Sequence, residues 1–265
     1  MSLLGGARLK PIRRLVASLA FVAATVTGVL AVTTPRAHAV TVVPVILELR
    51  NGGSQSSAVF TVDDSFATPL PVELTITKAK PSDGGLDDTG VSSDDLLVFP
   101  PQAIIQPGKT QAFRVQWVGD PAIKQSQHYY VTISQVPVQL PEDKDMVQVL
   151  YDFQVIVNVG LVGARPRLSV ANTEIQKDDK GVFHPVVSIV NTSNTYGYLE
   201  NGTLKVTVTD SAGKQIASKT YTPDDVHEFI GPGLVAAGQT RPFTIPMVLP
   251  NGEGKVAVSF RPSEN

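Results

Sequence analysis

The feature that most constrains this chain is a series of short β-branched segments that begins at Val40 and continues almost to the C-terminus. Apolar and polar residues alternate within the segments, and Gly, Pro, Asn or Asp separates one segment from the next. No part of this region keeps a helical apolar period over three turns. The pattern therefore predicts an all-β fold of the sandwich type.

The strands that the pattern predicts lie at residues 41–49, 57–62, 71–78, 110–118, 129–136, 147–161, 182–191, 202–209, 215–221, 241–248 and 254–260. Residues 81–95 are rich in Gly, Asp and Ser, which predicts a loop. The clearest internal break is Gly163-Ala164-Arg165-Pro166, and each side of it has the length of one immunoglobulin-like sandwich. We expect two immunoglobulin-like β-sandwich domains in tandem, residues 40–162 and 163–265, in a bent arrangement.

Residues 1–39 have the composition of an export signal. A basic stretch without acidic residues precedes an apolar run at residues 15–32, and Ala37 and Ala39 supply the small residues that a signal peptidase reads. We expect cleavage after Ala39, which makes Val40 the mature N-terminus and leaves no membrane insertion. A retained transmembrane anchor is the alternative, because the run is about long enough to span a bilayer. The small-residue exit favours cleavage.

The charge and the cysteine content exclude several classes of protein. Five of the 22 basic residues lie in the leader, which leaves 17 against 24 acidic residues and a formal charge of −7. An acidic exported chain lacks the basic face that nucleic-acid binding requires. The absence of cysteine excludes a disulfide scaffold, thiol catalysis and cysteine zinc sites. The fold must therefore be stabilised by hydrophobic burial.

Residues that could carry catalysis are sparse. His128, His184 and His227 stand at unrelated spacings, and the sequence has neither a phosphate-binding glycine loop nor a nucleophile elbow. The acidic pairs Asp94-Asp95 and Asp224-Asp225 are typical of solvated turns and not of paired catalytic carboxylates. Calcium binding through Asp87-Asp88 and Asp94-Asp95 is the minor alternative. We expect no enzymatic activity, no cofactor and no metal.

The most unusual segment is the predicted strand at residues 147–161. Its odd positions form an unbroken apolar row: Val147, Val149, Tyr151, Phe153, Val155, Val157, Val159 and Leu161. At about 3.3 Å per residue the segment would extend roughly 50 Å, about twice an ordinary strand. A long core strand explains part of the row. An edge strand that offers its backbone and alternate side chains to a partner explains the surplus.

Two further stretches carry a family resemblance. Residues 97–115 read LVFPPQAIIQPGKTQAFRV and residues 128–137 read HYYVTISQVP. Together with the long strand and Arg165-Pro166, they resemble the motifs of periplasmic pilus-assembly chaperones of the chaperone–usher family. The resemblance covers the chain from Val40 to about Arg167. Residues 43–49 and 95–101 are similar to the archaic branch of that family.

The resemblance implies a mechanism and a set of partners. Pilus subunits of such systems are immunoglobulin-like folds that lack their last strand, and the chaperone's long strand fills the open groove. The resemblance implies a periplasmic chaperone that binds pilus subunits without ATP and delivers them to an outer-membrane usher. The donor residues that it implies are Val147, Val149, Tyr151, Phe153, Val155 and Val157, with the first and last at the margins.

The sequence departs from the family at the anchor for the subunit's terminal carboxylate. The best-known branch uses an Arg in the first strand and a Lys in the long strand, and neither is present here. Arg114 is the candidate substitute, with Arg165 and Arg167 behind it. A surface arginine paired with a nearby acid is the alternative for Arg114.

A different class of protein stays open, namely a structural pilus subunit or adhesin built from tandem sandwiches. Such a subunit needs an exposed N-terminal extension and an incomplete last sandwich, whereas residues 255–260 predict a closing strand. A carbohydrate- or metal-binding module would need clustered aromatic side chains or a set of metal ligands. Neither pattern is present in the sequence.

Overall fold

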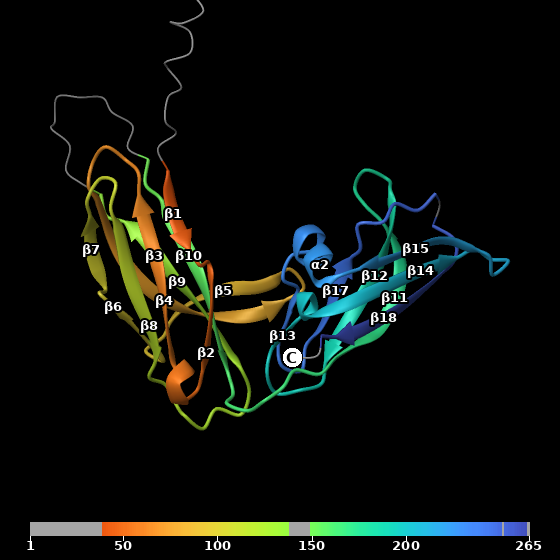
Figure 1. Cartoon of the computed structure of the whole chain (residues 1–265), viewed down its shortest axis with the longest axis horizontal. Helices are drawn as coiled ribbons and strands as arrows, with labels where there is room; N and C mark the ends of the chain where they lie inside the picture. The colour runs from red at the N-terminus through yellow and green to blue at the C-terminus, as the bar shows by residue number, and fades with distance from the viewer. Residues whose placement is uncertain (1–38, 138–148, 251, 264–265) are drawn as a thin grey trace, which may run out of the picture. The chain divides into compact units, whose positions relative to one another are not determined.

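The computed structural model describes residues 39–137, 149–250 and 252–263. Residues Val40–Asn265 form one compact unit. The described chain is nearly all strand and contains two β-sandwiches, each with a hydrophobic core of its own (Figure 1). This confirms the predicted all-β fold with two immunoglobulin-like sandwiches. Among the described residues, no helix is both long enough and apolar enough to cross a membrane.

The first sandwich contains strands β1 to β10. Their bounds are β1 Val40–Val43, β2 Ile46–Arg50, β3 Ser57–Asp64, β4 Leu70–Ser82, β5 Gly85–Ser92, β6 Leu96–Phe99, β7 Gln102–Ile105, β8 Thr110–Trp117, β9 Gln127–Gln135 and β10 Asp152–Gly160, with a 3-10 turn η1 at Gly53–Gln55. One sheet has the order β1-β3-β8-β6, and the other has the order β2-β10-β9-β4-β5 with β7 paired to β4. Alternate side chains point inward, so Phe60 on β3 stacks on Phe113 of β8 in the core.

The predicted strand at residues 41–49 is divided between the two sheets. Strand β1 pairs antiparallel with β3, and β2 pairs parallel with β10 from Ile46↔Ile156 to Arg50↔Gly160. The chain crosses between the sheets at Pro44, which has no N–H for a ladder. With the β2–β10 register continued backward, residues 42–45 would lie opposite residues 152–155. The crossing therefore leaves that part of β10 without a neighbour on one side.

Other differences from the predicted strands have local causes. The strand predicted at 147–161 is observed as β10, Asp152–Gly160, and Val147 lies outside the described residues. The prediction of a loop at 81–95 was wrong, because β5 pairs there with β4 and the turn at Asp83–Gly84 joins them. Strand β5 is exposed along most of its length, so it carries no apolar alternation that a sequence pattern could reveal.

The second sandwich follows the connection at residues 161–167. Its elements are β11 Leu168–Lys177, β12 Phe183–Asn191, β13 Gly197–Tyr198, η2 Leu199–Asn201, β14 Gly202–Thr209, β15 Gln215–Tyr221, α2 Pro223–Phe229, β16 Leu234–Val235, β17 Thr240–Thr244 and β18 Lys255–Pro262. The sheets are β11-β12-β17, β13-β16 and β15-β14-β18. Helix α2 begins with a capping box between Thr222 and Asp225, and Val226 anchors it in the core.

Candidate functional site, the uncovered edge of strand β10

Strand β10 has two differently covered edges. Strand β9 pairs with it along its length, from Asp152↔Ser134 to Val159↔Gln127. Strand β2 covers the second edge only from Ile156 onward. Among the described strands, none pairs with residues 152–155 on that second edge. The N-terminal half of β10 is therefore the edge of its sheet.

The backbone groups at this edge point away from the sandwich. The carbonyl of Tyr151 accepts from the N–H of Gln135 at 3.0 Å, so Tyr151 faces β9. The N–H of Ile156 donates to the carbonyl of Val45 at 2.9 Å, so Ile156 faces the other edge. Backbone groups alternate between the two edges of a strand, and those of Asp152 and Gln154 consequently face the uncovered side. Such groups are a template for pairing with a further strand.

The apolar row of β10 changes its surroundings along the strand. Val155 and Val157 are fully buried in the core of the first sandwich, so they belong to that core and not to the surface that a partner can reach. Phe153 is half-buried, and Tyr151 and Val149 are 41% and 60% exposed. We call residues 149–155 the donor segment. Of the predicted donor residues that the structure describes, Val149, Tyr151 and Phe153 are the accessible ones.

Aromatic contacts support the donor segment from one side. The Tyr151 and Phe153 rings stack with their centroids 6.2 Å apart, and the Phe66 ring lies 5.7 Å from that of Tyr151. Val43 and Val45, where the chain crosses between the sheets, are 53% and 55% exposed. The starts of β1 and β10 lie at the same end of the first sandwich (Figure 1). An apolar surface thus adjoins the uncovered edge.

The C-terminal half of β10 is held by a buried polar group. Asn158 is 1% exposed, its Oδ1 lies 2.6 Å from Nδ1 of His128, and its Nδ2 donates to the hydroxyl of Tyr198 at 2.8 Å. Burial lowers the pKa of His128, although the bond to Asn158 opposes this effect. The histidine is therefore neutral at pH 7. The hydrogen bonds of Asn158 hold this half of the strand inside the protein.

The structure separates the three predicted anchor arginines. Arg114 lies on β8, opposite Val59 and Phe99, on the outer face of the sheet that does not contain β10. It is therefore not brought to the donor segment. The guanidinium of Arg167 donates to the carbonyl of Thr192 at 3.2 Å.

Arg165 lines a cavity of about 490 Å³ that also contains a cation missed in the sequence analysis. This cation is Arg50 at the end of β2, and Glu48, Tyr196 and Tyr198 line the same cavity. The signal in the sequence was a basic residue that ends the first apolar run. The two guanidinium groups give this cavity the kind of donor that a carboxylate requires.

A second arginine that the sequence analysis did not identify is Arg241 on β17. Its Nε donates to the carbonyl of Asp83 at 3.0 Å and its Nη2 to that of Gly84 at 2.8 Å, both at the turn of the β4–β5 hairpin. Its Nη1 donates to the carbonyl of Leu234 at 2.6 Å. Burial lowers the pKa of Arg241, and the nearby charge of Asp83 opposes this effect. One half-buried guanidinium therefore satisfies three backbone acceptors.

Asp88 and Asp95, one residue from each of two acidic pairs, accept hydrogen bonds from neighbouring groups of the protein. Burial raises the pKa of Asp95, but hydrogen bonds from Ser93, Tyr129 and Lys78 outweigh burial and lower it below its ordinary value. Asp88 accepts from the N–H of Gly90 at 2.8 Å within β5. Within the described ranges, no group of three His, Cys, Asp or Glu side chains could hold a metal ion.

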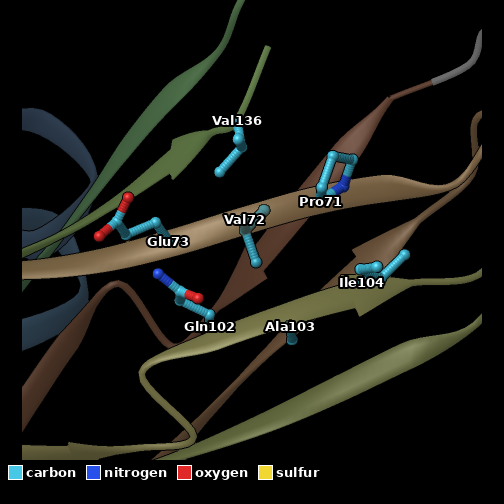
Figure 2. A pocket seen from close by; sticks show the side chains of 7 residues that line it. All are labelled: Pro71, Val72, Glu73, Gln102, Ala103, Ile104 and Val136. Atoms are coloured by element: carbon cyan, nitrogen blue, oxygen red, sulfur yellow. The ribbon is translucent and has the colours of Figure 1, made fainter. Parts of the chain in front are cut away.

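A second hollow, of about 360 Å³, lies where β7 pairs with the start of β4. Figure 2 shows the polar side chains of Glu73 and Gln102 at one end and the apolar Pro71 and Ile104 at the other. Val136, just after β9, completes the lining. The carboxylate of Glu73 and the amide of Gln102 are the polar side chains in this lining.

The chain is similar to solved structures but matches no family model and no curated sequence. The class 5 fimbriae chaperone CfaA is 12% identical, with 83% of this chain and 99% of CfaA covered and a TM-score of 0.48. The CsuC–CsuE chaperone–tip adhesion subunit complex, from archaic chaperone-usher Csu pili of Acinetobacter baumannii, gives 10% identity, coverages of 83% and 97%, and a TM-score of 0.47.

A third match is to the complex of SafA pilin with the SafB chaperone of Salmonella enterica. It gives 14% identity, coverages of 86% and 98%, and a TM-score of 0.47. These three structures are of fimbrial or pilus chaperones, alone or in complex.

Proposed function

We propose that this chain is a periplasmic chaperone of the archaic type that binds pilus subunits by donor-strand complementation and delivers them to an outer-membrane usher. Export and removal of residues 1–39 belong to the proposal. The donor segment supplies the missing strand of a subunit, with Val149, Tyr151 and Phe153 entering successive pockets of the subunit's groove.

The observation that carries the proposal is the coincidence of an uncovered sheet edge with exposed apolar side chains in one segment. Residues 152–155 lack a neighbour on one edge among the described strands, and Tyr151 and Val149 stand exposed directly before them. An exposed apolar edge strand is a hazard for an ordinary soluble protein, because it promotes aggregation. A protein whose task is strand addition uses the same features.

Burial of this surface supplies the binding energy. Full burial of an apolar side chain contributes about 1.5–3 kcal/mol relative to full exposure. Val149 and Tyr151 retain 60% and 41% of their exposure in the free chain, so much of that contribution is still available to a partner. The backbone groups of Asp152 and Gln154 add the hydrogen bonds of a new ladder. No nucleotide is required for this mode of binding.

For the subunit's terminal carboxylate, we assign the cavity that Arg165 and Arg50 line as the anchor. Charge-assisted hydrogen bonds from guanidinium to carboxylate are about twice as strong as neutral ones. Glu48 in the same cavity partly balances the two cations, so the cavity keeps an excess of one positive charge. Arg114 lies on the other sheet and is not part of this anchor.

The alternative, a structural subunit of tandem sandwiches, is not favoured. A subunit of that kind should lack the closing strand of its last sandwich. In the second sandwich, β18 pairs with β14 from Gly202↔Pro262 to Thr209↔Lys255. That sandwich therefore has its own closing strand.

Site-specific photocrosslinking in the periplasm of the native host tests the function. Benzoylphenylalanine placed at Tyr151 should trap a small exported protein with the strand pattern of an immunoglobulin-like fold. Phe229 on α2 is a matched control, because it is an aromatic residue of similar exposure, 47%, in the second sandwich. Mass spectrometry identifies the adduct. An adduct at position 229 but not at 151, or none at either, would reject the proposed donor segment.

A further inference from the structure

The end of strand β3 contains a buried carboxylate that is only half satisfied. Asp64 is 2% exposed. Its Oδ1 accepts from the N–H of Phe66 at 2.8 Å, whereas its Oδ2 is buried and has no hydrogen-bond partner among the described residues. An ionised oxygen in that position is costly, because it is removed from bulk solvent and no described group donates a hydrogen bond to it. A partner for Oδ2 should therefore exist in the working protein.

The register of the sheet places one residue directly opposite Asp64. That residue is Val40, the first residue of β1. The backbone of Asp64 bonds on its other side, since its N–H donates to the carbonyl of Lys109 at 3.1 Å and its own carbonyl accepts from Gly108 at 2.7 Å. Val40 and Asp64 are therefore a non-hydrogen-bonded pair, the type in which the two Cα atoms are about 4.5 Å apart.

The nitrogen of Val40 is bonded directly to that Cα, so it stands at the start of β1 beside Asp64. Within an uncleaved chain this nitrogen is a neutral amide with one N–H. Hydrolysis of the Ala39–Val40 peptide bond consumes one water and gives a carboxylate on Ala39 and an α-ammonium on Val40. The ammonium has a positive charge and three N–H donors below its ordinary pKa of about 8.

We propose that removal of the leader creates the missing partner of Asp64, in that the new α-ammonium of Val40 pairs with Oδ2 of Asp64. This inference rests on cleavage after Ala39, which is part of the proposed function. It adds a chemical reason for the position of the cut. A cut one residue earlier or later would move the ammonium by about 3.5 Å along the strand, away from the carboxylate.

The pair has a consequence for the donor segment. The other oxygen of Asp64 holds the N–H of Phe66, and the Phe66 ring contacts that of Tyr151. Fixing Asp64 through Val40 therefore fixes the turn that supports Tyr151. The exported, processed chain has this support and the precursor lacks it, so binding of subunits is coupled to arrival in the periplasm.

Other charged groups around Asp64 are few. Asp63 precedes it on β3 and accepts from the hydroxyl of Thr110, Lys109 stands in the turn before β8, and Asp152 begins β10. Lys109 is exposed and forms no salt bridge with Asp64 among the described residues. The α-ammonium of Val40 would be the cation that the register places beside Asp64.

A double-mutant cycle on protein recovered from the periplasm tests the pair. The full chain is expressed as it stands, with one Gly inserted between Ala39 and Val40, with Asp64→Asn, and with both changes. Intact mass confirms each N-terminus. The insertion should raise the equilibrium constant for unfolding about tenfold in the Asp64 background and leave it unchanged in the Asp64→Asn background. Asp63→Asn is the matched control, in which the insertion should keep its full effect.

An equal effect of the insertion in both Asp64 backgrounds, or no effect in either, would overturn the pair. If Asp64→Asn does not fold, chemical acetylation of the Val40 amine is compared with the untreated chain in urea at pH 7 and pH 9.5. The pair raises the pKa of the amine, so its stabilisation is present below about pH 8 and is lost at higher pH. Acetylated and untreated chains of equal stability at pH 7 would contradict the proposal. A different N-terminus in the mass spectrum would refute the cleavage site instead.

Discussion

Replacement of both aromatic residues of the donor segment separates a binding role from a core role. Tyr151→Thr with Phe153→Thr keeps an extended backbone acceptable, because threonine is a good strand residue. Truncation of a buried aromatic residue costs about 3–5 kcal/mol. Tyr151 is 41% exposed, its ring lies beside those of Phe66 and Phe153, and Phe153 is half-buried. We therefore expect the double variant to lose only about 1–2 kcal/mol of stability.

The matched control is Phe60→Ala in the core of the same sandwich. Phe60 is fully buried and stacks on Phe113 at 5.3 Å, so this variant should lose about 3–5 kcal/mol. Urea unfolding at pH 7 measures the stability of both variants. Their midpoints are compared when the dependence of the free energy of unfolding on urea concentration is the same. The amount of pilus subunit that co-purifies from the periplasm is measured separately.

The expected result is a small shift in the urea midpoint together with loss of the captured subunit. A stability loss as large as that of Phe60→Ala would return residues 151 and 153 to the ordinary core. Full capture of the subunit by the double variant would refute the donor-strand assignment.

Three further predictions concern other sites. Burial lowers the pKa of His128 below its ordinary 6.5, so the free energy of unfolding should fall as the pH drops below about 6.5. Urea unfolding at pH 7.5 and 5.0 should show a smaller fall for His128→Gln than for the unchanged chain. Equal falls in the two proteins would mean that another group causes the pH dependence. Arg241→Ala leaves three carbonyls without their donor and should cost about 1–3 kcal/mol, which an unchanged urea midpoint would contradict. Arg165→Ala should reduce subunit capture about tenfold while Arg114→Ala leaves it unchanged, and the reverse order in a pull-down would move the anchor to β8.

The sequence predicts the fold well, because the alternation of apolar residues marks the strands and the turn residues mark their ends. The inward rows of β3, β8 and β9 read directly as apolar residues two apart, and Gly163-Ala164-Arg165-Pro166 falls in the connection between β10 and β11. Strand β5 escaped prediction because it is exposed on nearly every side chain. Where partners do not bury a strand, its sequence has no reason to alternate.

The candidate site was predictable in kind but not in extent. The apolar row from Val149 to Val157 is uniform in the sequence, although Val155 and Val157 are core and Val149 is exposed. One face of one strand is exposed at its start and buried further on, so periodicity alone cannot mark where the core begins. Arg50 was missed for a related reason, because its contacts come from residues more than 100 positions away along the chain.

The position of the crossing at Pro44 determines how much of strand β10 has an uncovered edge. Strand β2 begins two residues after it, and that start determines where β10 ceases to be flanked. Because the backbone groups that face one edge recur every two residues, a crossing two positions later would lengthen the uncovered edge, and a crossing two positions earlier would shorten it. The length of the uncovered edge of β10 is thus determined near the start of the domain's sequence, where an insertion or deletion would change it without any change to β10 itself.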